Sequence, residues 1–152
     1  MKTYYRLAEF LLSVIVIIGS AASVAAQADK NQYFWGQFWL IWGPQAAMLI
    51  LLIICRSRPA AIIGSALVLS LYEVGFSVYA DATNDVNGLV WLGYFFSFPG
   101  AAIGGVIAND RLKAESFPST GIRVVFKMAV ATLIGLTLNQ AVICSTVMYC
   151  GI

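Results

Sequence analysis

The chain alternates long apolar stretches with short polar ones. Five apolar windows of 20 residues or more cover residues 7–26, 34–54, 59–80, 88–108 and 124–147. A helix needs roughly 20 such residues to cross a hydrocarbon core about 30 Å thick. The pattern therefore predicts an all-α membrane protein. We expect one integral membrane domain over residues 1–152, built as a bundle of four or five transmembrane helices.

The number of spans depends on the first window. MKTYYR, a hydrophobic run and then SVAAQA resemble a secretory signal peptide, with Val24 and Ala26 at the small-residue positions before a cleavage site. The run is nevertheless as long as a full span, and Glu9 interrupts its start. We favour a retained helix and keep the signal peptide as the alternative.

Basic residues are distributed unevenly over the polar segments. Lys30 stands alone on one predicted side. The other side holds Lys2, Arg6, Arg56, Arg58, Arg111, Lys113, Arg123 and Lys127. Because short cytoplasmic loops are rich in Lys and Arg, the second side is predicted to be cytoplasmic and the C-terminus to lie outside. Short loops without an Asn-x-Ser/Thr site favour a bacterial inner membrane. Asn109–Lys127 is the longest expected loop, since Pro118 and Gly121 should break any helix there.

Composition excludes several kinds of chemistry. Hydrophobic residues make up 61% of the chain and charged residues only 11%, whereas a soluble domain has about 25% charged residues. The net charge of +2 is too small to indicate nucleic acid. The chain has no histidine and no pair of cysteines at CxxC spacing, so we expect no metal site, no cofactor and no catalytic residues. The chain is therefore predicted not to be an enzyme.

The cysteines are three: Cys55, Cys144 and Cys150. In a continuous helix, Cys144 and Cys150 would be separated by about 9 Å of rise, which is too far for a disulfide. We therefore expect both to be unpaired. A disulfide between them is the alternative, and it requires the last helix to break.

A weak internal repeat connects the middle and the end of the chain. Residues 42–56 and 97–111 share a proline, an Ala-Ala pair and a final arginine at an offset of 55, and residues 69–74 and 136–141 share a shorter pattern at an offset of 67. These matches suggest two duplicated helical hairpins, with coincidence in a small apolar alphabet as the alternative. Pro44 and Pro99 fall near the predicted midplane, where each frees a backbone carbonyl.

Glu73 is the one charged residue between Pro59 and Ala80. An acid that faces lipid is costly, so Glu73 should face the bundle interior. Ala66, Ser70, Glu73 and Ser77 are spaced at steps of three and four and form a small, polar stripe on one helix face. Polar side chains at related depth are Gln37, Gln45, Asn139 and Gln140. No basic residue lies at that depth, so we expect Glu73 to be protonated or hydrogen-bonded. A proton or cation site and a hydrogen-bonded link between helices both remain open.

Two further patterns predict surfaces for contact. Gly100, Gly104 and Ala108 form a small-residue ladder that allows close helix approach, to a helix of the same chain or of another copy. Trp35, Trp39 and Trp42 form one stripe in the predicted outer half, where Trp91, Tyr72 and Tyr94 also lie. An aromatic belt at the membrane surface is the favoured explanation, and a recognition face is the alternative.

These features favour a small binding or accessory protein of the inner membrane. It would recognise another membrane-inserted protein, as an immunity or exclusion factor does, and its partners would be the lipid bilayer and either that protein or a second copy of itself. The alternative is a subunit of an oligomeric transporter for a small solute, a proton or a cation that uses Glu73.

Overall fold

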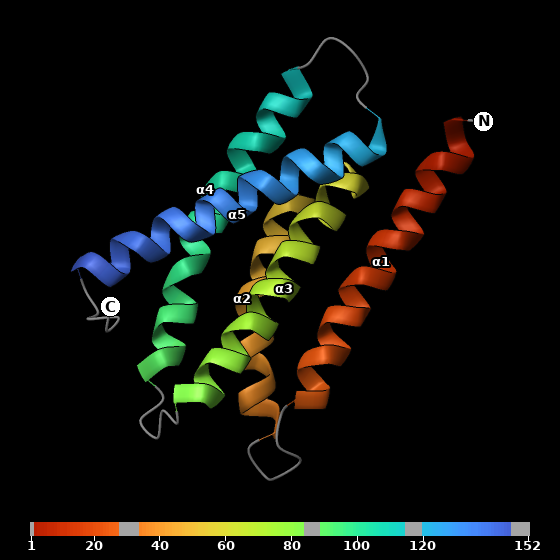
Figure 1. The fold of residues 1–152 in the computed structure, drawn as a ribbon. Helices are drawn as coiled ribbons and strands as arrows, with labels where there is room; N and C mark the ends of the chain where they lie inside the picture. Colours follow the sequence, from red (N-terminus) through yellow and green to blue (C-terminus); the bar gives the residue numbers. More distant parts are fainter. Residues whose placement is uncertain (1, 28–33, 84–88, 115–119, 147–152) are drawn as a thin grey trace.

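A computed structural model describes residues 2–27, 34–83, 89–114 and 120–146. These residues form five helices and no strand (Figure 1). The helices are α1 (Lys2–Gln27), α2 (Phe34–Ile54), α3 (Pro59–Thr83), α4 (Leu89–Ala114) and α5 (Gly121–Thr146). Each is long and apolar enough to cross a membrane.

The connection between α4 and α5 is shorter than predicted. Most of the segment Asn109–Lys127 is helical, because α4 continues to Ala114 and α5 begins at Gly121. Arg111 and Lys113 lie in the last turn of α4, where basic side chains interact favourably with the helix dipole. Gly121 is the first residue of α5 and does not interrupt it. The expectation of a long loop was therefore wrong over most of its length.

The helices pack around α3 and α5. Figure 1 shows α5 crossing α4 and α3 obliquely, and its contact with α4 is the most extensive in the bundle. Helix α1 packs mainly on α3. The N-terminal end of α1, the α2–α3 turn, the C-terminal end of α4 and the N-terminal end of α5 share one end of the bundle (Figure 1). Basic residues gathered at that end are Arg56, Arg58, Arg111, Lys113 and Arg123.

A tight turn joins α2 to α3. The amide of Ser57 donates to the Leu52 carbonyl at 3.0 Å, and that of Arg56 donates to Ile53 at 2.9 Å. This is a Schellman arrangement, which satisfies the last carbonyls of a helix when the residue after its end turns left-handed. Arg56 takes that conformation with φ 51°. Pro59 then begins α3, at the position where a missing amide hydrogen costs least.

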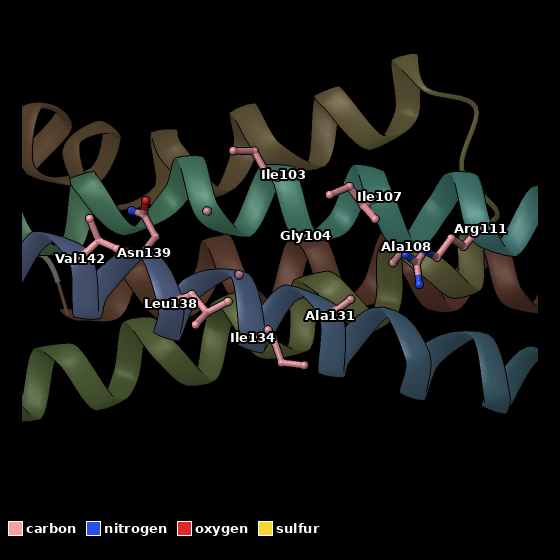
Figure 2. A pocket seen from close by; sticks show the side chains of 12 residues that line it. Ile103, Gly104, Ile107, Ala108, Arg111, Ala131, Ile134, Leu138, Asn139 and Val142 are labelled. Atoms are coloured by element: carbon pink, nitrogen blue, oxygen red, sulfur yellow. The ribbon is translucent and has the colours of Figure 1, made fainter.

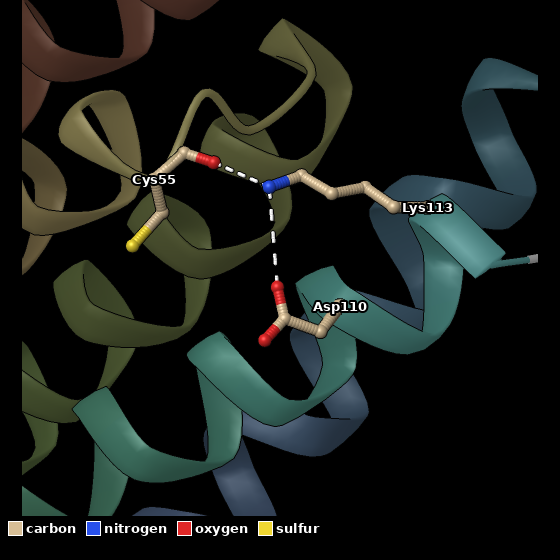
Figure 3. Close-up of polar contacts among 3 residues, drawn as sticks. All are labelled: Cys55, Asp110 and Lys113. Atoms are coloured by element: carbon tan, nitrogen blue, oxygen red, sulfur yellow. Dashed lines mark hydrogen bonds and ion pairs between the residues drawn. The ribbon is translucent and has the colours of Figure 1, made fainter.

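Side chains from two other helices hold this turn. Lys113 Nζ of α4 donates to the Cys55 carbonyl oxygen at 2.5 Å and lies 3.9 Å from Asp110 Oδ1 (Figure 3). Glu9 Oε1 of α1 lies 3.7 Å from Arg58 Nη2. The turn is thus linked to both α4 and α1.

Apolar side chains fill the centre of the bundle and also cover its surface. The largest fully buried ones include Leu52, Leu69, Met128 and Leu136. Large apolar side chains also stay exposed on all five helices, for example Ile15, Ile53, Leu71, Ile103 and Phe126. An exposed apolar surface that surrounds every helix is typical of chains whose solvent is lipid.

Glycines set the distance between α4 and α5. A Cβ on Gly104 would lie 2.5 Å from the Ala131 carbonyl oxygen, and one on Gly135 would meet the Gly100 carbonyl. No real side chain fits at such distances, so the two backbones are in direct contact. The helix that packs on the Gly100–Gly104 ladder is therefore α5 of the same chain. Ala108, the next position of the ladder, is half-buried.

We expect Gly104→Leu to lower the free energy of unfolding by at least about 1–3 kcal/mol, since the added side chain must push α5 away. Gly75→Leu is the matched control, because nothing lies within 4 Å of a Cβ at that position of α3. Both variants can be compared by thermal unfolding in detergent. Equal stability of the two variants would contradict the glycine contact.

Candidate functional site

Glu73 is buried inside the bundle. Its side chain is 1% exposed, and it interacts electrostatically with Tyr94 of α4. The neighbouring Tyr72 donates a long hydrogen bond from its hydroxyl to Gln140 Oε1 of α5, at 3.5 Å. The prediction that Glu73 faces inward therefore agrees with its burial, and α3 brings it close to Tyr94 of α4.

Tyr94 is the centre of this polar cluster. It is fully buried, and its hydroxyl accepts a hydrogen bond from Gln45 Nε2 at 3.0 Å. The same hydroxyl donates to the Ile41 carbonyl oxygen at 3.0 Å. Its ring stacks on Tyr72 with centroids 5.6 Å apart and planes 7° apart, and meets Phe98 edge-on at 5.0 Å. One side chain of α4 thereby contacts α2 and α3 through both polar and aromatic interactions.

The two internal prolines share a local pattern. Ile41, which accepts the Tyr94 hydroxyl, lies three residues before Pro44 in α2. Phe96 lies three residues before Pro99 in α4, and its carbonyl accepts a hydrogen bond from Asn139 Nδ2 of α5. A proline removes one backbone donor from its helix and displaces the preceding turn. The carbonyls that lose their donor belong to Leu40 and Phe95, four residues before each proline. In both helices a side chain of a neighbouring helix donates to the next carbonyl of that displaced turn.

One more buried pair connects α3 with α5. Ser65 Oγ and Thr132 Oγ1 lie 3.1 Å apart, and both side chains are fully buried. These positions differ by 67, the offset of the second half of the repeat. However, α4 and α5 are packed far more closely than α2 and α3. The two hairpins are thus arranged differently, and their duplication stays a prediction.

The predicted polar residues fall into separate contacts. Gln45 binds Tyr94, Gln140 binds Tyr72, and Asn139 binds the Phe96 carbonyl. Gln140 Nε2 also lies 3.6 Å from Cys144 Sγ. Ser70 and Ser77 are half-buried on α3. The tyrosine cluster, and not a ring of amides and serines, is therefore the main polar feature of the interior.

Sequence reasoning missed the role of Tyr94. It grouped this residue with the aromatic residues of a membrane-surface belt, whereas the structure places it in the core. A signal was available, because Tyr94, Ser97, Ala101 and Gly105 recur at helical steps and all four are buried. A large residue at the start of a stripe of small ones faces the same neighbour as they do.

The three tryptophans of α2 have two different environments. Trp35 and Trp39 are 67% and 55% exposed. Trp42 is half-buried, and its Nε1 donates to Ser20 Oγ of α1 at 3.2 Å. Phe38 lies between them, stacked on Trp42 with centroids 5.7 Å apart. The outward aromatic face is therefore Trp35 and Trp39, and Trp42 joins α2 to α1.

Cysteine pairing differs from the expectation. Cys144 is disulfide-bonded, so the expectation that it is unpaired was wrong, while Cys55 has a free thiol. The spacing argument assumed a continuous helix, but α5 ends at Thr146. Cys150 lies outside the described residues.

A groove of about 580 Å³ runs along the outer side of the α4–α5 contact (Figure 2). Its floor is formed by small residues, and its sides are formed by branched apolar ones. The lining includes Gly104, Ile103, Ile107, Ala131, Ile134 and Leu138. Arg111 lies at one end, and Asn139 and Val142 lie at the other (Figure 2). Glu73 does not line this groove.

Comparisons with known proteins gave no match to a protein-family model, a curated protein or a solved structure. Any inference about function must therefore start from the geometry of the chain itself.

We expect Glu73→Leu to destabilise the bundle by about 1–3 kcal/mol, because it removes the polar partner of a buried cluster. Glu73→Gln keeps the size and hydrogen-bonding capacity of the neutral acid and should stay close to the native stability. Ser77→Ala, on the same face of α3 one turn further on, is the control. Thermal unfolding in detergent distinguishes them, and a Leu variant as stable as the native chain would rule out a structural link at Glu73.

Proposed function

We propose that this chain is a multi-pass protein of a bacterial inner membrane that binds another membrane-inserted protein. It would act as an accessory subunit or as an immunity or exclusion factor. Its basic end would lie in the cytoplasm and its C-terminus outside. Support comes from five helices long enough to span and from apolar side chains exposed on each of them.

The exposed aromatic pair carries this proposal. Trp35 and Trp39 are largely exposed, whereas Tyr94 and Gln45 are buried in the bundle. Tryptophan is the residue most enriched in the small set that dominates binding energy at protein interfaces. The same pair would also suit a membrane-surface belt, so a direct test of contact is needed.

The test uses a photo-crosslinking amino acid in place of Trp39, in native membranes. The proposal expects a discrete adduct with one membrane protein, which Trp35→Ala should weaken by tenfold or more. Placing the crosslinker at Ile53, which is 54% exposed near the other end of α2, controls for adducts of chance encounters. Lipid adducts alone at position 39 would contradict the proposal and leave a belt.

A second function, transport of a proton or cation in an oligomer, has one specific observation in its favour. Glu73 is a buried acid that interacts with a buried tyrosine, and helices α2 and α4 beside it both contain an internal proline. Proteoliposomes distinguish the two functions by proton flux under an imposed membrane potential. If native protein carries flux and a folded Glu73→Gln variant does not, the chain is a transporter, because an amide cannot titrate. Absence of flux from both supports the binding function.

A further inference from the structure

The α4–α5 groove is lined mainly by apolar side chains, but one of its ends carries a charge. One end holds Arg111, an exposed side chain in the last turn of α4. Within the part of the chain that the structure describes, Arg111 has no hydrogen bond or ion pair. The neighbouring Asp110 lies instead beside Lys113. A guanidinium without a counter-charge therefore lies at the end of an apolar groove.

The part of the groove that ends at Arg111 matches one leaflet in length. Gly100 and Arg111 are its extreme lining residues on α4, and at about 1.5 Å per residue they are roughly 16 Å apart. Half of a hydrocarbon core about 30 Å thick is roughly 15 Å. This part of the groove leads from near the predicted midplane to the basic end of the bundle. On α5 the lining continues past Gly135, which faces Gly100, as far as Val142, so the whole groove is longer than one leaflet.

The floor of the groove is also already closed to another helix. Its glycines are in backbone contact across α4 and α5, so their space is used within the chain. Above the floor stand Ile103, Ile107, Ile134 and Leu138, each half or more exposed. Between these ridges lies a furrow whose apolar walls suit a flexible hydrocarbon chain.

We propose that this groove binds one anionic phospholipid of the leaflet at the basic end. An acyl chain lies along the furrow, and Arg111 contacts the headgroup phosphate, for which a guanidinium offers paired donors. The inference rests on the membrane insertion proposed above and uses a different surface from Trp35 and Trp39.

The test is native mass spectrometry of the full chain in mild detergent, with phosphatidylglycerol and phosphatidylcholine of identical acyl chains added in equal amounts. We expect one phosphatidylglycerol retained per chain in preference to phosphatidylcholine. Arg111→Gln should lower that preference by about fivefold, the size expected for one basic residue near an anionic lipid. Arg123→Gln removes the same charge from the same end of the bundle outside the groove and should leave the preference unchanged.

A second variant tests the furrow itself. Ile107→Trp should fill the furrow and reduce retention of phosphatidylglycerol while Arg111 remains.

Equal loss of preference in Arg111→Gln and Arg123→Gln would overturn the site in favour of general charge attraction. A dimer that Ile107→Trp dissociates would assign the groove to a second copy and also overturn it. If the chain retains neither lipid and is not recovered in membranes, the insertion proposal fails too, whereas an unchanged Trp39 adduct with no lipid preference would sink this inference alone.

Discussion

Hydrogen bonding without access to water is the constraint on which this bundle depends. Inside an apolar bundle, a polar group must find its partner within the protein. Pro44 and Pro99 add to this requirement, because each removes one backbone hydrogen bond from its own helix. Tyr94 donates to the turn before the first proline and Asn139 to the turn before the second. The donor comes from α4 for the turn in α2 and from α5 for the turn in α4, so these two bonds link α2 to α4 and α4 to α5.

Close packing then follows from the small residues between those bonds. Asn139 can reach the Phe96 carbonyl because Gly100, Gly104 and Gly135 let α4 and α5 approach to backbone contact. The furrow lies on the outer side of this contact. Its floor is formed by the small residues, and its walls are formed by branched side chains such as Ile103 and Ile134. Several polar side chains thereby find partners in the interior, and large apolar side chains cover much of the surface. Candidate binding features lie on that surface: an aromatic pair on α2 and the furrow that ends at Arg111.

Much of the architecture could be predicted from the sequence, and the reason is hydropathy. An apolar window such as residues 34–54 is just long enough for one membrane-spanning helix, and α2 has the same bounds. Helix ends in the polar segments were harder, because charged residues such as Arg111 and Lys113 continue a helix as readily as they leave it. The burial of Glu73 could be predicted from the cost of an exposed acid. The role of Tyr94 could not, because an amphipathic ring suits a surface belt and a core equally well until its neighbours are known. Membrane insertion, orientation and function stay proposals.

The most direct test of this account is a double-mutant cycle between Pro44→Ala and Tyr94→Phe, measured as free energies of unfolding in detergent. In the native background, loss of the Tyr94 hydroxyl should cost about 0.5–1.5 kcal/mol or more, the net contribution of a buried hydrogen bond. Alanine at position 44 removes the ring that displaces this turn, so the Gln45 amide should donate to the Ile41 carbonyl at full strength and the same loss should then cost clearly less. The cycle with Pro99→Ala, whose turn is served by Asn139, should be additive. A coupling between Pro44 and Tyr94 that exceeds about 0.5 kcal/mol is the predicted result, and additivity in both cycles would contradict the account.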